Sequence, residues 1–365
     1  MKIALVHDYL QTIGGSEAVF RTLIEIYPQA EMYTLFHNRR KIFPTLKTKT
    51  SFIQKIPLKD YTKLLFLFPT AIESLKLPKD TKMILSSSHA FAKGIKKPRG
   101  AIHVCYCHTP MRYVWDMRDE YIKNEIIPKR FKIILPFFVE KLRNWDSKNA
   151  QEVDFFIANS KNVQSRIKKY YNRESVVIYP PVRTKFFKPA RTKKEEFYLI
   201  VSRLVAIKRI DIAIQACNKL NRKLIIIGDG REASRLKAMA GPNIEFKGEL
   251  SDEEVRNRYQ RCKAFIFPSN DDFGITPVEA QACGKPVIAF GKGGALETVI
   301  EGKTGHFFYE QTPEALAKAI QECEKIKFDK KLCRRNALRF DEEIFKKKIK
   351  AFIAEKYKAH NEKKR

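Results

Sequence analysis

Short apolar stretches alternate with longer amphipathic ones along most of this chain. Apolar runs bounded by turn residues indicate buried strands, and apolar positions that recur at helical spacing indicate helices. Strands and helices in alternation are typical of parallel sheets that helices cover on both faces. The pattern therefore predicts an α/β protein built from doubly wound parallel sheets.

The expected elements fall into two sets. The first half has expected helices at residues 16–27 and 161–171, and strands at residues 2–7, 32–36, 83–86, 103–106, 155–158 and 176–178. The second half has expected helices at residues 209–220, 232–240, 252–261 and 277–282, and strands at residues 198–201, 223–227, 244–246, 264–267 and 286–289.

Paired prolines mark the boundary between these sets. Tyr179-Pro180-Pro181-Val182 begins a stretch that continues to Pro189, and prolines hold such a connection stiff and extended. We therefore expect two Rossmann-like domains facing a central cleft, residues 1–180 and 191–340, with a linker at 181–190. A helix and a basic tail follow at 341–365. Ligands of such sheets bind at the carboxyl ends of the strands.

The net charge of the chain indicates which class of partner it attracts. The chain holds 71 Lys and Arg against 41 Asp and Glu, a net charge of +30, which attracts phosphate groups. Cations gather in residues 39–68 and 346–365, and the first run also carries apolar side chains. Such a run is either a solvated face or an interfacial contact with an anionic membrane. A nucleic-acid partner is not expected, because no recognition module is visible.

The chain is expected to be cytoplasmic. No apolar run approaches the roughly 20 residues of a membrane-spanning helix, and the first residues form a strand pattern rather than a signal peptide. The seven cysteines are odd in number and mostly far apart, so we expect small buried hydrophobic residues rather than disulfides or a metal site.

Candidate binding residues in the first half follow strands. Gly14 and Gly15 precede a helix, where a backbone without side chains approaches an anion closely, although a plain tight turn explains them too. His108 follows a strand and precedes Pro110, a position suited to a sugar hydroxyl or to a packed structural histidine. His7 is a weaker candidate of the same kind. The dinucleotide fingerprint is absent, which argues against a nicotinamide enzyme.

The second half offers a cationic clamp and an acidic loop. Arg203 and Lys208 surround the turn after its first strand, a pattern suited to a diphosphate. Asp271 and Glu279 flank a predicted helix start, where Gly274 permits close backbone approach to an oxygen. Further glycine turns follow other strands. Gly228-Asp229-Gly230 and Lys247-Gly248 form either ordinary turns or the border of a nucleobase site, and Gly291-Lys292-Gly293-Gly294 is similar to a second phosphate-side loop.

Together these residues resemble the family-four glycosyltransferases of the GT-B fold. The resemblance spans nearly the whole chain, and three pieces carry it: Gly14-Gly15-Ser16-Glu17, Arg203 with Lys208, and the segment from Asp271 to Glu279 followed by Gly284-Lys285-Pro286-Val287-Ile288-Ala289. Within the family, the stretches 86–90, 106–113 and 293–298 look like the mannosyltransferases of bacterial O-antigen and polysaccharide assembly.

The resemblance implies a role for each candidate. Residues 191–340 would bind the nucleotide-sugar donor and residues 1–180 the acceptor, with the last helix returning to the first domain. Arg203 and Lys208 would hold the diphosphate, and Asp271 would meet the transferred sugar. The remaining site comprises His108 at the sugar, Gly14 and Gly15 near the phosphates, Asp272 with the backbone of Phe273, Gly274, Ile275 and Thr276 around the sugar, and Gly228, Lys247, Gly248 and Glu279 at the nucleoside.

One departure concerns the acidic pair. The family's pair begins with glutamate, whereas this chain has Asp271, whose shorter arm leaves Asp272 as a possible substitute.

The resemblance also implies the chemistry. It implies retaining transfer of a hexose, with GDP-mannose as the expected donor, a lipid-linked oligosaccharide as acceptor, and no metal or other cofactor. The basic run at 39–68, with a second segment at 129–138, would attach the protein to the cytoplasmic face of the inner membrane. The alternatives are a UDP-sugar donor and an inactive scaffold subunit that binds a nucleotide sugar without catalysis.

Overall fold

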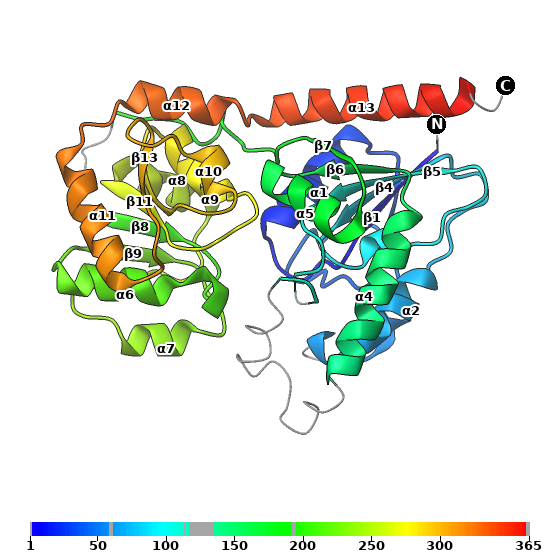
Figure 1. Cartoon of the computed structure of the whole chain (residues 1–365), viewed down its shortest axis with the longest axis horizontal. Coiled ribbons are helices and arrows are strands. Elements are labelled where there is room, and N and C mark those ends of the chain that lie inside the picture. The colour runs from blue at the N-terminus through cyan, green and yellow to red at the C-terminus, as the bar shows by residue number, and fades with distance from the viewer. Residues whose placement is uncertain (1, 58–60, 113, 117–134, 192–194, 363–365) are drawn as a thin grey trace. The chain divides into compact units, whose positions relative to one another are not determined.

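The computed structural model describes residues 2–57, 61–112, 114–116, 135–191 and 195–362 (Figure 1). The chain divides into two compact units. Unit 1 comprises Met1–Tyr179 and Phe345–Arg365, and unit 2 comprises Pro180–Ile344. Each unit has its own parallel sheet, so the predicted fold of two doubly wound parallel-sheet domains is confirmed.

Unit 1 is built on a seven-stranded sheet in the order β3-β2-β1-β4-β5-β6-β7. Its strands are β1 (Ile3–His7), β2 (Glu31–Thr34), β3 (Lys49–Thr50), β4 (Met83–Ser88), β5 (Ile102–Cys107), β6 (Phe155–Ala158) and β7 (Ser175–Val177). Its helices are α1 (Gly15–Ile26), η1 (Phe52–Lys55), η2 (Tyr61–Leu67), α2 (Phe68–Glu73), η3 (Ala92–Gly94), α4 (Leu135–Gln151), α5 (Lys161–Tyr171) and α13 (Glu342–Glu362).

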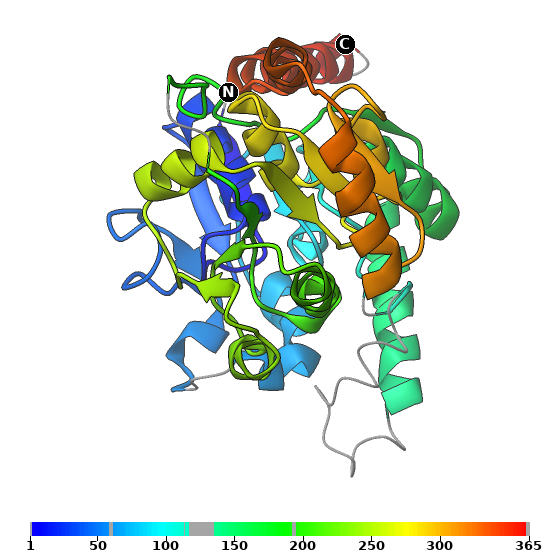
Figure 2. The ribbon, with the colours of Figure 1, turned by 90° about the vertical axis from the view of Figure 1, so that its left-hand side faces the viewer.

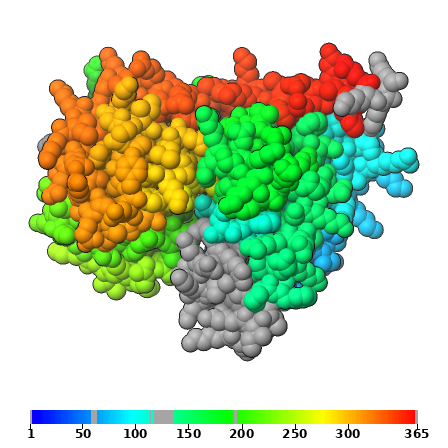
Figure 3. All heavy atoms as spheres, in the orientation of Figure 1, coloured from blue at the N-terminus to red at the C-terminus, as the bar shows by residue number. Residues whose placement is uncertain are grey.

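Both faces of this sheet are buried because alternate side chains of a strand point to opposite faces. Ile3 and Leu5 of β1 pack in the core beneath α1, whereas Ala4 and Val6 pack in the core beneath α2 and α4. Helix α13 lies along unit 1 (red in Figures 1 and 3), and its apolar side chains join the core with α1: Phe345, Ile349, Phe352 and Ile353.

Unit 2 is built on a six-stranded sheet in the order β10-β9-β8-β11-β12-β13. Its strands are β8 (Tyr198–Val201), β9 (Leu224–Ile227), β10 (Ile244–Phe246), β11 (Ala264–Phe267), β12 (Val287–Phe290) and β13 (Gly305–Phe308). Its helices are η5 (Ala206–Lys208), α6 (Ile210–Lys219), α7 (Ala233–Ala238), α8 (Asp252–Arg261), α9 (Ile275–Ala282), α10 (Ala295–Thr298), α11 (Pro313–Lys325) and α12 (Lys330–Leu338).

Helices also cover the sheet of unit 2. One buried cluster joins alternate strand residues such as Ile200 and Ile226 to apolar residues of α6 and α11. Figure 2 shows α11 (orange) and the green helices α6 and α7 beside these strands. All strand pairs in the sheet are parallel, so the carboxyl ends of its strands meet at one edge. The candidate site residues of unit 2 are therefore expected at that edge.

Two further expectations concern cysteine and the membrane. All seven cysteines are buried and free of disulfides, which confirms their prediction as small hydrophobic residues. Within the described ranges, no helix has the length and apolar character needed to cross a bilayer.

Candidate active site

Lys208 and Asp271 form an ion pair at the carboxyl edge of the sheet in unit 2. Lys208 ends η5, after β8, and Asp271 lies in the loop between β11 and α9. Nζ of Lys208 lies 2.5 Å from Oδ2 of Asp271, and each side chain is 17% exposed. A charge-assisted bond in a partly desolvated place is stronger than a surface ion pair. Arg203, in the same β8–η5 loop, is exposed.

The start of helix α9 follows directly. Gly274 is the N-cap residue, its φ is +90°, and no side chain caps the helix. A Cβ atom at Gly274 would lie 2.9 Å from Cζ of Phe267, so a larger residue meets both a strained backbone and a close neighbour. The first turn, with Ile275 and Thr276, therefore presents backbone N–H groups of the kind that bind anions.

Phe273 has a structural side chain. Its ring is buried and lies edge-on to Phe340, with 5.4 Å between ring centroids. A contribution of Phe273 to ligand binding is thus restricted to its backbone, as the sequence analysis expected. The neighbouring Asp272 is half-buried.

A second glycine loop, which contains Gly293 and Gly294, packs against the loop that carries Asp271. Gly294 N donates to the carbonyl oxygen of Asp271 over 2.9 Å. A Cβ atom at Gly294 would lie 2.3 Å from Cα of Phe273, and one at Gly293 would lie 2.5 Å from the Asp271 oxygen. The two backbones approach so closely that only glycine fits at these positions. This contact holds Asp271 near Lys208.

Glu279 accepts a hydrogen bond from a buried tyrosine that the sequence analysis missed. The hydroxyl of Tyr259, on α8, lies 3.2 Å from Oε2 of Glu279, on α9. Burial raises the pKa of Tyr259 well above its usual value, and the Glu279 charge raises it further, so the hydroxyl stays a donor. Glu279 itself is half-buried. Tyr259 thus orients the carboxylate predicted to bind the ribose.

The turn glycines after β9 and β10 pack against each other. Gly228 N donates to the Gly248 oxygen over 2.7 Å, and a Cβ atom at Gly228 would lie 2.0 Å from the Ser202 oxygen. The φ of Gly228 is +125° and that of Gly248 is +65°. These turns therefore have a structural reason for glycine, and their role beside a nucleoside stays a prediction.

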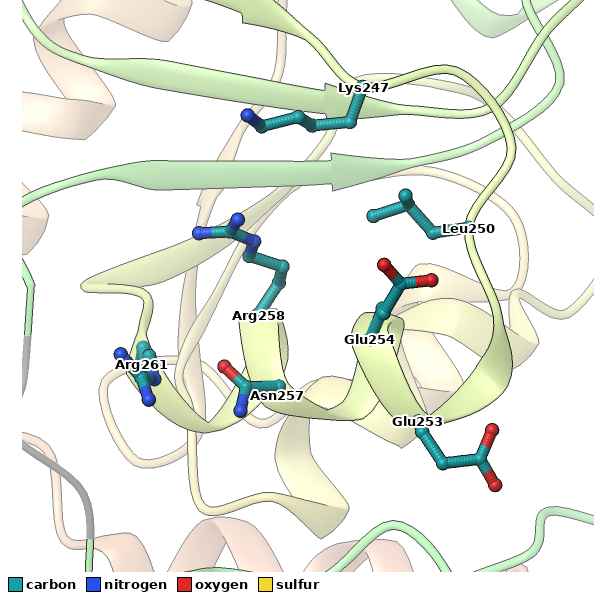
Figure 4. Close-up of a pocket in the computed structure, with 7 residues that line it drawn as sticks. All are labelled: Lys247, Leu250, Glu253, Glu254, Asn257, Arg258 and Arg261. Atoms are coloured by element: carbon teal, nitrogen blue, oxygen red, sulfur yellow. The ribbon is translucent and has the colours of Figure 1, made fainter.

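Lys247 forms an ion pair with Glu245 and lines a pocket along α8 (Figure 4). In this view the Arg258 side chain rises from α8 toward the level of Lys247, whereas Glu253 points away from the other side chains. The pocket is lined by Lys247, Leu250, Glu253, Glu254, Asn257, Arg258 and Arg261. It shares only Lys247 with the predicted site and contains neither Lys208 nor Asp271.

In unit 1, His108 lies in a buried polar cluster at the carboxyl ends of β1, β4 and β5. Nε2 of His108 lies 2.8 Å from the Ser87 hydroxyl oxygen, which lies 3.1 Å from Nδ1 of His7. Burial is the main cause that lowers the pKa of His108 to about 3, so the ring is neutral at neutral pH. His108 is 8% exposed.

Asp8 is a fully buried member of this cluster. Its two carboxylate oxygens accept four backbone N–H groups, those of residues 89–92, and Nδ1 of His89 lies 2.8 Å away. Burial raises the pKa of Asp8, but His89 outweighs that effect and holds it far below the usual value. Asp8 therefore ties β1 to the segment that follows β4.

Gly14 and Gly15 begin α1 beside the same cluster. Gly14 is the N-cap residue without a side-chain cap, and Gly15 is the first helical residue. A Cβ atom at Gly14 would lie 2.9 Å from Oε2 of Glu17, which is buried and lies 3.4 Å from Nε2 of His7. Both glycines thus lie in unit 1 with His108, whereas the other predicted site residues lie in unit 2.

Sequence patterns did not reveal the interior of this cluster. They marked His7 as a weak candidate and indicated no role for Ser87, Glu17, Asp8 or His89. The available signal was the polar character of strand ends: His7-Asp8 and Ser86-Ser87-Ser88-His89 both end buried strands, where polar residues need a reason.

The two parallel α/β sheets, with candidate residues at the carboxyl edge of each, define the GT-B class of fold. A solved structure from Anabaena, HepE in complex with UDP and glucose, matches this fold with a TM-score of 0.71 and 20% identity, over 97% of this chain and 99% of that one.

The sequence relatives give the class of enzyme. Residues 181–339 match the family model described as "Glycosyl transferases group 1". An uncharacterized glycosyltransferase from Methanocaldococcus jannaschii is 25% identical over 88% of this chain and 88% of its own length. A GDP-mannose-dependent alpha-(1-6)-phosphatidylinositol monomannoside mannosyltransferase from Mycolicibacterium smegmatis is 31% identical over 39% of this chain and 44% of its own. The carboxyl-terminal half thus matches a glycosyltransferase family model, and the whole chain has the GT-B fold, as the resemblance to family four predicted.

Proposed function

We propose that this protein transfers mannose from GDP-mannose to a lipid-linked or polysaccharide acceptor in cell-surface glycan synthesis, with retention of the anomeric configuration. The observation that carries the proposal is the Lys208–Asp271 pair beside the uncapped start of α9. A cation, a carboxylate and free helical N–H groups suit the pyrophosphate and hydroxyls of a sugar nucleotide.

The chemistry needs stabilisation of a leaving nucleoside diphosphate. In our proposal Arg203 and Lys208 hold that charge, and the dipole of α9 adds to it, so no metal takes part. The bond from the anomeric carbon to the phosphate oxygen breaks while the acceptor oxygen bonds to the same face. The acceptor's hydroxyl proton passes to a phosphate oxygen of the departing diphosphate. Asp271 contacts the sugar, and Glu279, held by Tyr259, contacts the ribose.

Mannose is proposed because of the relatives. The mycobacterial relative is GDP-mannose-dependent and acts on a phosphatidylinositol mannoside, and an amoebal relative from Dictyostelium discoideum is an alpha-1,3/1,6-mannosyltransferase. The phosphatidylinositol mannoside also supports a lipid-linked acceptor for this chain. His108, in its neutral form, is proposed to contact the transferred sugar, and Gly14 and Gly15 to lie near the phosphates.

Peripheral attachment to the cytoplasmic face of the inner membrane is part of the proposal. Among the described residues of the 39–68 run, the cations are exposed, including Arg39, Arg40 and Lys55. Phe52 and Phe66 are exposed as well, whereas Ile42 and Ile53 belong to the core, so fewer apolar side chains are available to a membrane than the sequence suggested. Most of the second proposed segment, 129–138, lies outside the described residues.

A thermal-shift screen tests the donor. The full chain is heated with GDP, UDP, ADP and their sugars, and GDP-mannose is expected to raise the Tm most, because a ligand at about 100 times its Kd stabilises the folded state by about 2.7 kcal/mol. A larger shift with a UDP-sugar would make the GDP-mannose assignment wrong. Absence of any shift would overturn the proposal.

Release of diphosphate then tests catalysis. The donor that gives the largest shift is incubated with lipid-linked acceptors, and release of the nucleoside diphosphate is measured. Binding without release with every acceptor would favour the inactive scaffold subunit.

A further inference from the structure

Four buried side chains in unit 1 form one chain of hydrogen bonds that ends at His108. Glu17 Oε1 lies 3.4 Å from Nε2 of His7, and Nδ1 of His7 lies 3.1 Å from Oγ of Ser87. Ser87 Oγ also lies 2.8 Å from Nε2 of His108. One serine hydroxyl therefore links two imidazole rings, and the acidic end of the chain lies in the first turn of α1.

A serine with two ring neighbours has one proton to donate. Its hydroxyl donates to one ring nitrogen and accepts from the other, so the direction of the chain decides which nitrogen of His108 carries a proton. The direction follows from Glu17 together with a single proton on His7. Burial raises the pKa of Glu17, but the hydrogen bond from His7 lowers it to about 2, so its carboxylate only accepts.

The protons are then assigned one by one. When His7 carries a single proton and donates it from Nε2 to Glu17, its Nδ1 is an acceptor. Ser87 donates its hydroxyl proton to that Nδ1, and its oxygen accepts from His108. We propose that Glu17, His7 and Ser87 are positioning residues that hold His108 in its Nε2–H tautomer, so that Nδ1 is a hydrogen-bond acceptor.

The Nε2–H tautomer limits the kinds of group that can hydrogen-bond to Nδ1 of His108. In the described part of the chain, no hydrogen bond joins Nδ1 of His108 to another group, and 8% of the residue's surface is exposed. An acceptor nitrogen binds a group that carries a proton, such as a sugar hydroxyl, and not a bare phosphate or carbonyl oxygen. The inference rests on the proposed function in this respect, because it assigns His108 to bind a hydroxyl group of the nucleotide-sugar donor.

Other charged groups around His7 do not enter the chain of bonds. Asp8 is occupied by four backbone N–H groups, and the ring of His89 pairs with Asp8. The opposite face of the His7 ring stacks on Phe20, at 4.7 Å between ring centroids. Glu17 is therefore the charged group that orients the hydrogen bonds between His7, Ser87 and His108.

A neighbouring pair of residues supplies a matched control. Nε2 of His103, on β5, lies 2.8 Å from Oγ of Ser86, the neighbour of Ser87 on β4. Both residues are buried, as Ser87 and His108 are, and the pKa of His103 is also lowered by burial to about 3. Within the described part of the chain no hydrogen bond connects Ser86 to Glu17, so a change at Glu17 is expected to leave His103 unaffected.

Nuclear magnetic resonance of protein labelled with ¹⁵N-histidine tests the tautomer of His108 in the absence of a nucleotide sugar. Long-range ¹H–¹⁵N correlation at neutral pH separates Nε2–H from Nδ1–H rings, and His108→Gln and His103→Gln assign the signals. The wild type is expected to show His108 as Nε2–H. An Nδ1–H signal, which a doubly protonated His7 would cause, overturns the proposal and needs no variant that might alter the fold.

Substitutions test whether Glu17 and Ser87 determine the tautomer of His108. Ser87→Ala is expected to give His108 a mixture of tautomers, and Glu17→Gln the same, because an amide donates or accepts. Ser86→Ala is expected to affect the signals of His103 alone. An unchanged His108 signal in both Ser87→Ala and Glu17→Gln overturns the relay.

Turnover supplies the functional readout. Ser87→Ala is expected to lower kcat/KM about 5- to 10-fold, while Ser86→Ala keeps the wild-type value. Equal kcat/KM in Ser87→Ala and wild type would overturn the role of the tautomer. If wild type turns over no nucleotide sugar, the proposed function fails, whereas the tautomer result stands by itself.

Discussion

Nζ of Lys208 lies 2.5 Å from Oδ2 of Asp271, although 63 residues separate them in the chain. The two residues were predicted to bind different parts of one donor, the diphosphate and the sugar. In the structure each side chain neutralises the charge of the other. A diphosphate that arrives at Lys208 therefore meets a cation whose charge is already shared with a carboxylate, and opposite effects follow for the two substitutions.

Lys208→Ala is expected to lower kcat/KM for the nucleotide sugar by about 10²- to 10³-fold, because it removes a fixed charge from the developing diphosphate. Steady-state release of the nucleoside diphosphate measures the change. Lys219→Ala is the matched control, since Lys219 is an exposed lysine on α6 with only a 3.9 Å contact to Glu314. Turnover in Lys208→Ala within twofold of wild type would remove the lysine from the mechanism.

Asp271→Asn is expected to bind the free nucleoside diphosphate about three- to tenfold more tightly, since a carboxylate no longer competes for Lys208 or repels the phosphates. Transfer of the sugar is expected to fall in the same variant, because the sugar loses an ionic acceptor. Calorimetry with the diphosphate and turnover with the donor measure the two effects. Weaker binding of the diphosphate would show that the ion pair does not compete with the ligand.

Gly274→Ala is expected to destabilise unit 2 by about 1–3 kcal/mol and to weaken donor binding, because φ is +90° and the new Cβ meets Phe267 at 2.9 Å. Gly302→Ala separates the two causes, since its φ is +67° but nothing lies within 4 Å of an added Cβ. Urea unfolding and calorimetry measure both variants. Equal loss of donor affinity in the two variants would contradict a site at the start of α9.

Buried neutral histidines are expected to make the protein less stable below neutral pH. Burial lowers the pKa values of His103 and His108 to about 3 from an ordinary value of 6.5. Between these values the unfolded state binds more protons, so the free energy of unfolding falls as pH falls through 6.5. Each histidine is expected to contribute a loss of about 1 kcal/mol from pH 7 to 5.5.

Urea midpoints at pH 7 and 5.5 measure this loss in wild type and in His103→Gln, a site away from the relay. Glu17 and Asp8 add nothing in this range, because both stay ionised in the folded and the unfolded chain above pH 5.5. An equal loss of stability in wild type and His103→Gln would show that His103 is not neutral in the fold.

Membrane attachment is expected to depend on charge and on exposed aromatic rings. Vesicles with anionic lipid should retain the full chain at low salt and release it as salt rises, because screening weakens contacts of surface cations. Phe66→Ser is expected to reduce retention more than Tyr309→Ser, which removes a similarly exposed ring from unit 2. Equal retention of both variants would place the contact elsewhere, and no retention of wild type would contradict attachment.

Much of the fold was predictable because strands here are buried on both faces. The strands Phe155–Ala158, Tyr198–Val201 and Ala264–Phe267, and the helices Lys161–Tyr171 and Asp252–Arg261, begin and end where the pattern placed them. The pattern missed β3 (Lys49–Thr50), since a strand of two polar residues has no hydrophobic signature. It also missed β13 (Gly305–Phe308), a short strand at the sheet edge.

The candidate site was predictable only in part. Glycine and charge at strand ends pointed to Gly274, Lys208 and Asp271, because parallel strands bring their carboxyl ends to one edge. The contact of Tyr259 with Glu279 joins two helices. The chain from Glu17 to His108 joins one helix, two strands and the residue that follows a third strand. Local patterns carry no information about such distant partners.

The sequence by itself determined the alternation of strands and helices, the division near residue 180, and which residues lie at strand ends. These properties follow from hydrophobic periodicity and turn chemistry, which act over a few neighbouring residues. Only the tertiary structure decided that Lys208 pairs with Asp271 and that Ser87 lies between two imidazole rings. Burial makes the energy of a polar group depend on partners brought close by folding, and their separation along the chain does not reveal them.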